Sequence, residues 1–441
     1  MATEFTPEIV RSHPSLPEVN ASVSVSKSPF YWRRLIGFLG PGFLISVGYM
    51  DPGNWATDIA GGSRFGYTLL FVIMASNLMA ILLQSLSLKL GVATERDLAQ
   101  LCRESTGRVG SMVLWLMAEV AIAACDMAEV IGSAIALNLL FHIPLLWGVL
   151  ITSLDVLLIL LLQRWGFRTV ESIVMVLIGT ILALFCIQTI LSQPEYGAAL
   201  GSLFIPSAAI VTNRAMLFIA IGMLGATVMP HNLYLHSSIV QSRRYKRTPE
   251  GKREAIKFAN IDSALALTIA LFVNAAILVV AAAVFHRSGH FEVAAIEDAY
   301  KLLSPLLGAG FASTLFAIAL LASGQNSSIT GTLAGQVVME GFIRLKMAPW
   351  LRRLVTRTIA IVPTIVVVAL RGEHGTEKLL LLSQVILSLQ LSFAVVPLVI
   401  FTSSRKHMGE FVNGALLKWT AWGVAALIAG LNGWFLVLMT K

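Results

Sequence analysis

The stretches Asp51-Pro52-Gly53-Asn54 and Met229-Pro230-His231-Asn232 each interrupt an apolar segment that is long enough to cross a bilayer. Proline removes a backbone donor and clashes with the preceding turn, so each stretch predicts a break in its helix. The carbonyl groups that a break frees need partners, because hydrocarbon offers none. Both stretches also carry side chains that bind metal ions. Two broken helices with such residues at mid-membrane are typical of transporters that are built from two related halves.

The composition of the 441 residues is that of an all-α polytopic membrane protein. Hydrophobic residues make up 56% of the chain, charged residues only 13%, and the mean hydropathy is +0.79. A globular domain carries about 25% charged residues. Apolar runs of roughly 20 residues match the thickness of a bilayer, and their continuity excludes a β-barrel, whose strands alternate. The net charge of +8 is explained by cytoplasmic loops, and we expect no nucleic-acid partner.

Eleven transmembrane helices are expected, and residues 36–441 are expected to form a single transmembrane domain. The approximate limits of the spans are 36–60, 66–90, 111–141, 144–163, 170–191, 215–241, 261–285, 309–343, 355–370, 378–401 and 417–439. If the amino terminus is inside, most of the 32 Lys and Arg residues fall in inner segments, as the positive-inside rule requires. We therefore expect a cytoplasmic amino terminus and, after an odd number of spans, an external carboxyl terminus.

The two breaks fall in the first and sixth spans. Five spans separate them, and an odd number of spans in a repeat makes the second copy run the opposite way through the membrane. We therefore expect a 5+5 inverted repeat over about 36–191 and 215–401, with the helix 417–439 as an addition.

Three features outside the breaks have simple interpretations. Residues 1–35 are rich in Ser, Pro, Val and Glu, and we expect them to form a disordered cytoplasmic tail. The basic residues are densest at Arg243, Arg244, Lys246, Arg247, Lys252, Arg253 and Lys257. We interpret that cluster as a topology-setting loop, with a lipid or partner role as the alternative. The widely spaced Cys102, Cys125 and Cys186 predict small apolar residues rather than disulfides.

Asp51 and Met229 are the candidate residues that indicate a metal ion. A charged side chain in mid-membrane costs about 2.5–3.5 kcal/mol on insertion scales. Asp51 either satisfies the broken helix or, with the amide oxygen of Asn54, binds a cation. Met229 taken alone is usually a gap filler. At the matching break, its soft thioether favours a transition metal over Mg²⁺ or Ca²⁺. The freed carbonyl of Ala226 and the nearby Gly48 are further candidates.

Several polar residues are candidates for proton movement. His231 is a ligand, a proton acceptor or a buried structural histidine, and His236 is a weaker candidate of the same kind. The span 111–141 carries Glu119, Asp126 and Glu129, which share one broad helix face. They predict a proton relay, or partners for the basic residues Arg352, Arg353 and Arg357. Gln384, in the tenth span, is expected either to bond to a neighbouring helix or to line an aqueous route.

The two breaks and the stretch from Gly225 to Ser237 resemble the Nramp family of proton-coupled divalent metal transporters, and the resemblance runs from about residue 36. It implies a leucine-transporter-like fold, import of Mn²⁺ or Fe²⁺ (with Cd²⁺ and Co²⁺) and H⁺ as the co-transported ion. It also implies that Asp51, Asn54, Met229 and the Ala226 carbonyl bind the metal. Protons would move through Asp51, His231, Asp126 and Glu129. A monomer in the bacterial inner membrane, with no resident cofactor, is expected.

Rival functions differ in the residues that they require. A sodium-coupled amino-acid carrier of the same fold needs small residues at the first break and no Met and His opposite. An integral-membrane metalloenzyme needs a zinc motif or an activated nucleophile, and we find neither in the sequence. A metal-sensing receptor needs a soluble domain, for which no segment is long enough. A channel differs from a carrier in its high, pH-independent flux.

Overall fold

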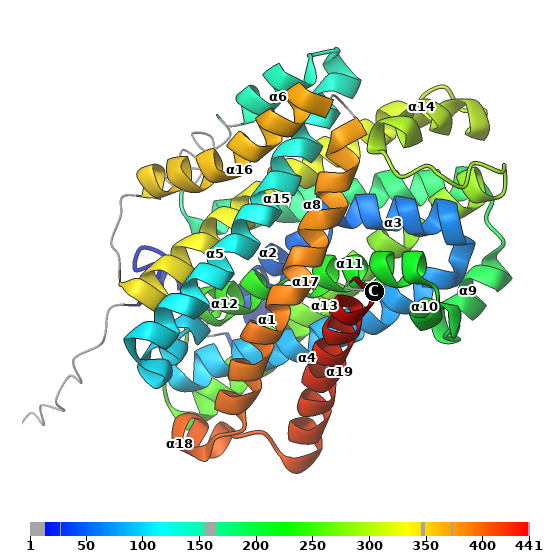
Figure 1. The fold of residues 1–441 in the computed structure, drawn as a ribbon. Helices are drawn as coiled ribbons and strands as arrows, with labels where there is room; N and C mark the ends of the chain where they lie inside the picture. Colours follow the sequence, from blue (N-terminus) through cyan, green and yellow to red (C-terminus); the bar gives the residue numbers. More distant parts are fainter. Residues whose placement is uncertain are drawn as a thin grey trace, which may run out of the picture.

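The computed structural model describes residues 14–26, 28–152, 154, 165–344, 349–371 and 374–439 as a bundle of helices with one short strand pair (Figure 1). The larger elements are β1 Val23–Ser24, α1 Tyr31–Phe38, α2 Pro41–Gly48, α3 Pro52–Phe65, α4 Leu70–Thr94, α5 Leu98–Phe141, α6 Leu145–Thr152, α8 Phe167–Ser192, α9 Tyr196–Phe204, α10 Ala209–Thr212, α11 Arg214–Val228, α12 Pro230–Ile239, β2 Arg243–Arg244, α13 Pro249–Ala281, α14 Ile296–Leu307, α15 Ala312–Ile343, α16 Pro349–Arg371, α17 His374–Thr402, α18 Arg405–Met408 and α19 Ala415–Met439.

Helix is present in each of the eleven expected span ranges. The expected span 144–163 is helical over Leu145–Thr152, and most of its remainder lies outside the described residues. Within the described chain, seven helical segments are long and apolar enough to cross a membrane. The long helix α5 packs along α15 and also contacts α17. The protein is therefore an all-helical polytopic membrane protein.

Both predicted helix breaks are confirmed. Helix α2 ends at Gly48 and α3 begins at Pro52, while α11 ends at Val228 and α12 begins at Pro230. In each case the proline takes the first helical position, where its missing N–H would have had no intrahelical partner. The same proline that ends one half-helix therefore starts the next.

Glycine allows the broken helices to pack closely against their neighbours. A side chain on Gly91 of α4 would place its Cβ 2.1 Å from the backbone carbonyl oxygen of Ser237 in α12. A Cβ on Gly132 of α5 would lie 2.2 Å from the Cβ of Pro52 at the start of α3. These contacts bring α4 and α5 against the half-helices that follow the two breaks.

The expectation of disorder across residues 1–35 does not hold for residues 14–26. Leu16 is 1% exposed and Val19 is 7% exposed, and both belong to the main hydrophobic core. Strand β1 pairs in parallel with β2, and α1 follows. A segment that is polar on average still contains two well-placed apolar side chains, and composition alone does not reveal this. Residues 1–13 lie outside the described part of the chain.

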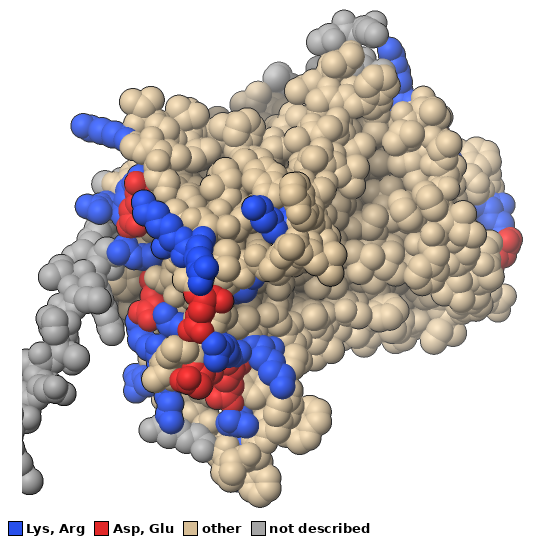
Figure 2. Space-filling view, turned by 90° about the horizontal axis from the view of Figure 1, so that it is seen from below, with Lys and Arg blue, Asp and Glu red and all other residues tan. Residues whose placement is uncertain are grey.

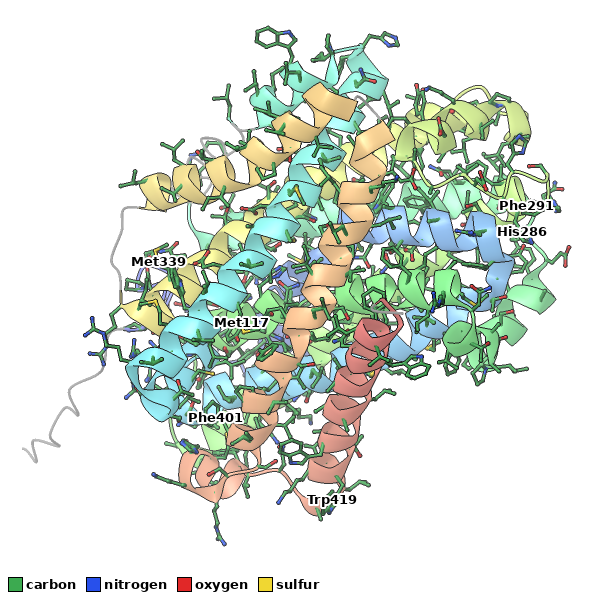
Figure 3. All side chains as sticks on the ribbon, in the orientation of Figure 1. Met117, His286, Phe291, Met339, Phe401 and Trp419 are labelled. Atoms are coloured by element: carbon green, nitrogen blue, oxygen red, sulfur yellow. The ribbon has the colours of Figure 1, made fainter. Side chains whose placement is uncertain are left out.

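The charged residues gather at one end of the molecule (Figure 2). Ion pairs there join Arg34 to Glu254, Arg96 to Glu104, Arg247 to Glu95 and Arg253 to Glu410. Figure 3 places His286 and Phe291, whose rings contact each other, at the opposite end. This asymmetry is the structural counterpart of the basic inner segments expected from the sequence.

Candidate metal site

Asp51 and Asn54 lie side by side at the first break. Asp51 caps α3, and its Oδ1 accepts the backbone N–H of Asn54 at 2.8 Å. The same oxygen accepts the side-chain amide of Asn54 at 2.7 Å. Both side chains are buried. Asp51 Oδ2 has no hydrogen-bond partner among the described residues, so one carboxylate oxygen is available to a cation.

Three oxygen atoms converge on the amide nitrogen of Asn54. They are the carbonyl of Gly48 at 3.3 Å, Oδ1 of Asp51 at 2.7 Å and the carbonyl of Ala226, on α11, at 3.1 Å. A primary amide has only two hydrogens to donate. The two breaks therefore present more acceptors than this donor can satisfy, and they do so around a single point.

Met229 brings a sulfur atom to the same place. Its side chain is fully buried at the second break, between α11 and α12. A Cβ on Gly48 would lie 3.0 Å from Met229 Sδ and 2.4 Å from Asn232 Nδ2. Gly48 thus allows the thioether to approach the backbone of the first break. The structure brings together Gly48, Asp51, Asn54, Ala226 and Met229, as the sequence predicts.

Gln384 of α17 covers the two breaks. A Cβ on Gly53 would lie 1.9 Å from Gln384 Nε2, and a Cβ on Gly225 would lie 2.2 Å from the Gln384 carbonyl oxygen. Gln384 Nε2 donates to Ser383 Oγ at 2.8 Å, while Oε1 has no partner among the described residues. Its amide oxygen is therefore a further acceptor beside the breaks.

Two of the three acids of α5 lie together. A Cβ on Gly331 of α15 would lie 3.0 Å from Asp126 Oδ1 and 3.1 Å from Glu129 Oε1. Glu129 Oε1 also accepts the thiol of Cys125 at 3.6 Å. Cys125 shares a small buried cluster with Met229, so this turn of α5 reaches the candidate site. Cys125 is buried as predicted, but it also makes a polar contact.

Glu119 lies two helical turns before Asp126 and is less buried. It accepts the indole N–H of Trp115 at 3.1 Å. The structure thus separates it from the pair that approaches Gly331. The side chains of Arg352, Arg353 and Arg357, the expected basic partners, lie outside the described part of the structure.

The two histidines of α12 have different surroundings. His231 is buried one residue after Pro230, and within the described chain its Nδ1 has no hydrogen-bond partner. His236 Nδ1 lies 2.9 Å from Gln84 Oε1, and Gln84 Nε2 donates to the Tyr49 hydroxyl at 2.8 Å. A polar chain therefore runs from His236 through α4 to Tyr49, which is two residues from Asp51.

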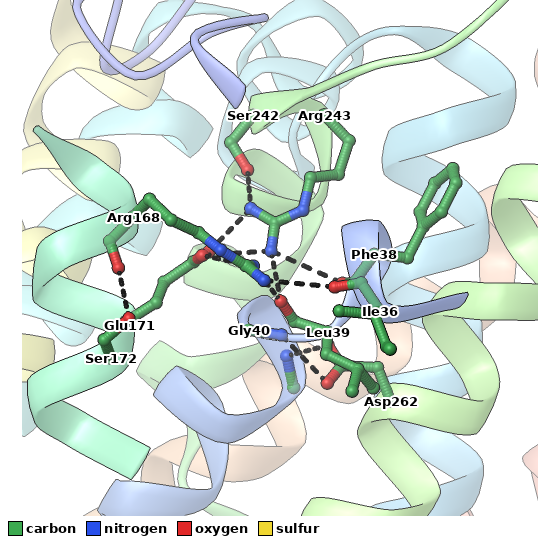
Figure 4. A network of polar contacts seen from close by, with 11 residues as sticks. Ile36, Phe38, Leu39, Gly40, Arg168, Glu171, Ser172, Ser242, Arg243 and Asp262 are labelled. Carbon is green, nitrogen blue, oxygen red and sulfur yellow. Dashed lines mark hydrogen bonds and ion pairs between the residues drawn. The ribbon is translucent and has the colours of Figure 1, made fainter. Parts of the chain in front are cut away.

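Arg243, the first residue of the basic cluster, is a buried structural residue rather than an exposed loop residue. It is 2% exposed, and its guanidinium bonds to Glu171 at 2.6 Å and to the carbonyl of Leu39 at 2.6 Å (Figure 4). Asp262 accepts the backbone N–H of Gly40 at 3.0 Å. The buried ion pair between Arg243 and Glu171 and the carboxylate of Asp262 therefore fix the junction between α1 and α2 by hydrogen bonds.

Asp58 is a buried carboxylate that the sequence analysis missed. It lies one turn beyond Asn54 on α3, is 2% exposed, and its Oδ2 has no partner among the residues that the structure describes. The signal was available, because Asp58 follows Asp51 by seven residues in one apolar span, the spacing that separates Glu119 from Asp126.

The ligands that meet at the breaks are chemically mixed. No three His, Cys, Asp or Glu side chains come together as a metal site in the described ranges. A cation at the breaks would instead contact a carboxylate, carbonyl oxygens, an amide and a thioether. Such a set accepts Mn²⁺ and similar ions, while Mg²⁺ and Ca²⁺ prefer oxygen alone.

Paired half-helices around a polar site define the class of protein as a secondary transporter with the leucine-transporter-like fold. Two remote structures share this fold. They are MHP1, a nucleobase-cation-symport-1 family transporter in a closed conformation (TM-score 0.62, 14% identity, 90% of each chain covered), and MhsT in complex with L-phenylalanine (TM-score 0.57, 15% identity, 90% of this chain and 97% of that chain).

The chain belongs to the Nramp family, because the model of natural resistance-associated macrophage protein-like sequences matches residues 42–438. A divalent metal cation transporter MntH from Nostoc sp. is 60% identical over 97% of this chain and 96% of its own, and one from Listeria innocua is 61% identical over 95% and 93%. The crystal structure of the Eremococcus coleocola manganese transporter with an aromatic bis-isothiourea compound has a TM-score of 0.88 and 45% identity, and covers 95% of this chain and 90% of that one.

Proposed function

We propose that this protein imports a divalent transition-metal ion, Mn²⁺ or Fe²⁺ above all, together with protons that move in the same direction. The ligands are Asp51, Asn54, Met229 and the carbonyl of Ala226. The observation that carries this proposal is the convergence of three oxygens on the Asn54 amide, next to the sulfur of Met229. The manganese and divalent-cation transport of the relatives supports it.

A cation at the breaks replaces the Asn54 amide as the positive partner of these oxygens. A half-turn of the amide about its Cβ–Cγ bond exchanges the positions of its oxygen and nitrogen, so it would turn the oxygen toward the ion. Gln384, beside Gly53, is placed to add another oxygen. The thioether makes the site less suitable for Mg²⁺ and Ca²⁺.

Proton movement follows from the same geometry. A divalent ion beside Asp51 favours the ionised carboxylate, so any proton on Asp51 must leave. Asp126 and Glu129 are the acidic groups on the adjacent turn of α5, next to Cys125 in the cluster that contains Met229. His231, one residue beyond Pro230, is a second acceptor. Protons and the metal ion thus both bind at Asp51, and their routes through the protein diverge from there.

Alternating access requires the half-helices to move around the site. We infer eleven spans in a 5+5 inverted repeat, with the amino terminus in the cytoplasm and the carboxyl terminus outside. The site opens outward first and then inward as α2 and α12 rock. An inside-negative potential adds about 2.3 kcal/mol per charge per 100 mV, so it drives cations inward. A monomer in the bacterial cell membrane suffices for this cycle.

The sodium-coupled amino-acid carrier is the weaker candidate. Its substrate carboxylate would have to lie beside Asp51, and the space there is occupied by the Met229 side chain, within 3.0 Å of a Cβ on Gly48. Two like charges at one buried point repel each other.

The test is Mn²⁺ uptake into proteoliposomes, measured together with internal pH and with Ca²⁺ and Mg²⁺ as competitors. The native protein should acidify the lumen during Mn²⁺ uptake, and Ca²⁺ and Mg²⁺ should not reduce its rate of uptake. Met229→Ala should let Ca²⁺ or Mg²⁺ compete about tenfold better, because the remaining ligands are hard oxygens. Met112→Ala is the matched control, since Met112 is 46% exposed on α5. Unchanged discrimination in Met229→Ala would refute the role of the thioether.

A further inference from the structure

Residues 14–26, here called the strap, cross the charged end of the molecule before α1 begins. Leu16 and Val19 are inserted into the main core, while Pro17 and Ser24 are exposed. A segment that only linked a tail to the first helix would not need such insertion. The strap therefore contributes to closing this end of the bundle.

Two hydrogen bonds tie the strap to α15. The backbone N–H of Leu16 donates to Glu340 Oε2 at 2.9 Å. Gln336 Nε2 donates to Glu18 Oε1 at 3.0 Å and also to Glu340 Oε1 at 3.0 Å. Gln336 and Glu340 are one turn apart on α15, so the strap binds one face of its last turns.

Other bonds tie the strap to the segment that follows α12. The N–H of Ala21 donates to the Gln241 carbonyl at 3.0 Å, and the Arg244 guanidinium donates to the Ala21 carbonyl at 3.1 Å. In the β1–β2 pair, Val23 lies opposite Arg243 and Ser24 lies opposite Arg244. The strap is thus joined to the chain just beyond the second broken helix.

The strap is coupled to the first broken helix through Arg243. This residue pairs with Val23 by its backbone, and its side chain bonds to Glu171 of α8 and to the carbonyl of Leu39, just before α2 (Figure 4). One short strand pair therefore joins the strap to the half-helices on this side of both breaks, α2 and α12.

The backbone of the strap is strained. Leu16 has φ +55° and Ala21 has φ +52°, both in the left-handed region that side chains with a Cβ disfavour. The contacts at Leu16 and at the strand pair maintain this conformation. Strain lowers the free energy needed to release the segment, so the bound strap is suited to be one of two states.

We propose that the strap is a cytoplasmic latch that keeps α2 and α12 closed and that must detach before the cation can leave inward. The inference rests on the proposed alternating access. It assigns to the segment before α1 a direct part in the transport cycle, since Leu16, the β1–β2 pair and Arg243 connect α15, the chain beyond α12 and the start of α2 in a structure whose site is buried.

A reversible disulfide tests the latch. Ser24→Cys with Arg244→Cys places two thiols at paired, exposed positions, where parallel strands lie close enough for a disulfide. Oxidation should reduce Mn²⁺ uptake about tenfold or more, and reduction should restore it. Each single cysteine, oxidised in the same way, is the control. Full uptake by the oxidised pair, with free thiols shown to be consumed, would overturn the proposal.

Release of the strap gives the opposite test. Leu16→Asp should detach it, whereas Pro17→Asp changes the exposed neighbour. We expect alkylation of the buried Cys102 of α5, followed by mass spectrometry, to become about tenfold faster in Leu16→Asp alone. Equal rates in both variants would contradict the latch. If Leu16→Asp unfolds the protein, its thermal unfolding transition is lost, and the disulfide test then decides. Alkylation needs no transport, so it separates failure of the latch from failure of the proposed function.

Discussion

At the scale of single residues, the carboxylate of Asp58 is the buried group whose burial most needs an explanation. Asp58 follows Asp51 by seven residues, and a rise of about 1.5 Å per residue places it about 10 Å farther along α3. A second negative charge at that distance attracts a divalent ion by roughly 3 kcal/mol at an effective dielectric constant near 20, before screening by water and salt. Asp58→Asn should therefore raise the KM for Mn²⁺ uptake by about tenfold while changing kcat less.

The control for Asp58 is Asp298→Asn, because Asp298 is an exposed aspartate on α14 whose side chain is 52% accessible. Initial uptake rates over a range of Mn²⁺ concentrations give KM and kcat for both variants. An unchanged KM in Asp58→Asn would mean that the Asp58 carboxylate is neutral or screened during uptake.

Asp97 links stability to pH at the charged end of the molecule. Burial raises the pKa of Asp97 from 3.8 to about 6, although Ser15, the backbone N–H of Gln100 and the charge of Arg103 oppose that shift. The folded protein thus binds this proton more tightly than the unfolded chain does. The resulting stabilisation, at most about 3 kcal/mol, is complete below pH 4 and is lost as the pH rises through about 6.

Asp97→Asn isolates this contribution. Asparagine is also a good N-cap and can accept the Gln100 N–H, which bonds to Asp97 at 2.8 Å. We expect the unfolding temperature of the native protein to fall more steeply between pH 5 and 7.5 than that of the variant. Parallel profiles would show that the ionisation of Asp97 does not contribute.

At the scale of elements, the crossing of α4 and α12 depends on Gly91. Its would-be Cβ lies 2.1 Å from the Ser237 carbonyl oxygen, and a backbone atom cannot rotate away as a side chain can. Gly91→Ala should therefore separate the helices and lower stability by about 1–3 kcal/mol. Gly179→Ala, on α8 with no atom within 4 Å of the new Cβ, should be neutral or slightly stabilising. Thermal unfolding in detergent compares them, and equal losses would contradict the argument.

The helix breaks were predictable from sequence because each depends on one local cause, a proline inside an apolar run. The approach of Asn54 to the Ala226 carbonyl, and of Met229 to Gly48, followed once the two breaks were assumed to meet. The burial of Arg243 was not predictable, since its partner Glu171 is 72 residues away and Arg243 stands at the start of a run that is rich in basic residues. The strap was hidden for a similar reason: its apolar residues are scattered among Ser, Pro and Glu, and the core that Leu16 and Val19 enter lies on distant helices.

At the scale of the whole molecule, polarity is distributed along one axis. Charged residues gather at the end that carries the strap and the Arg243 network (Figure 2), and the breaks lie in the apolar body. The protein therefore has one end that is tied together by ion pairs and hydrogen bonds, and a polar site that is enclosed by hydrocarbon-facing helices. Motion of α2 and α12 requires their ties at the charged end to change, while α5 and α15 remain packed along each other.

Binding of a cation at the breaks should stabilise the whole molecule, because the ligands come from both halves of the chain and separate when it unfolds. At a Mn²⁺ concentration of 100 times Kd the gain is about 2.7 kcal/mol. We expect Mn²⁺ to raise the unfolding temperature, and Ca²⁺ at the same concentration to have little effect. Asp51→Asn should abolish the Mn²⁺ shift, because it removes the carboxylate that faces the Ala226 carbonyl across Asn54. An equal shift with Ca²⁺, or one that survives Asp51→Asn, would place the bound ion at the protein surface instead.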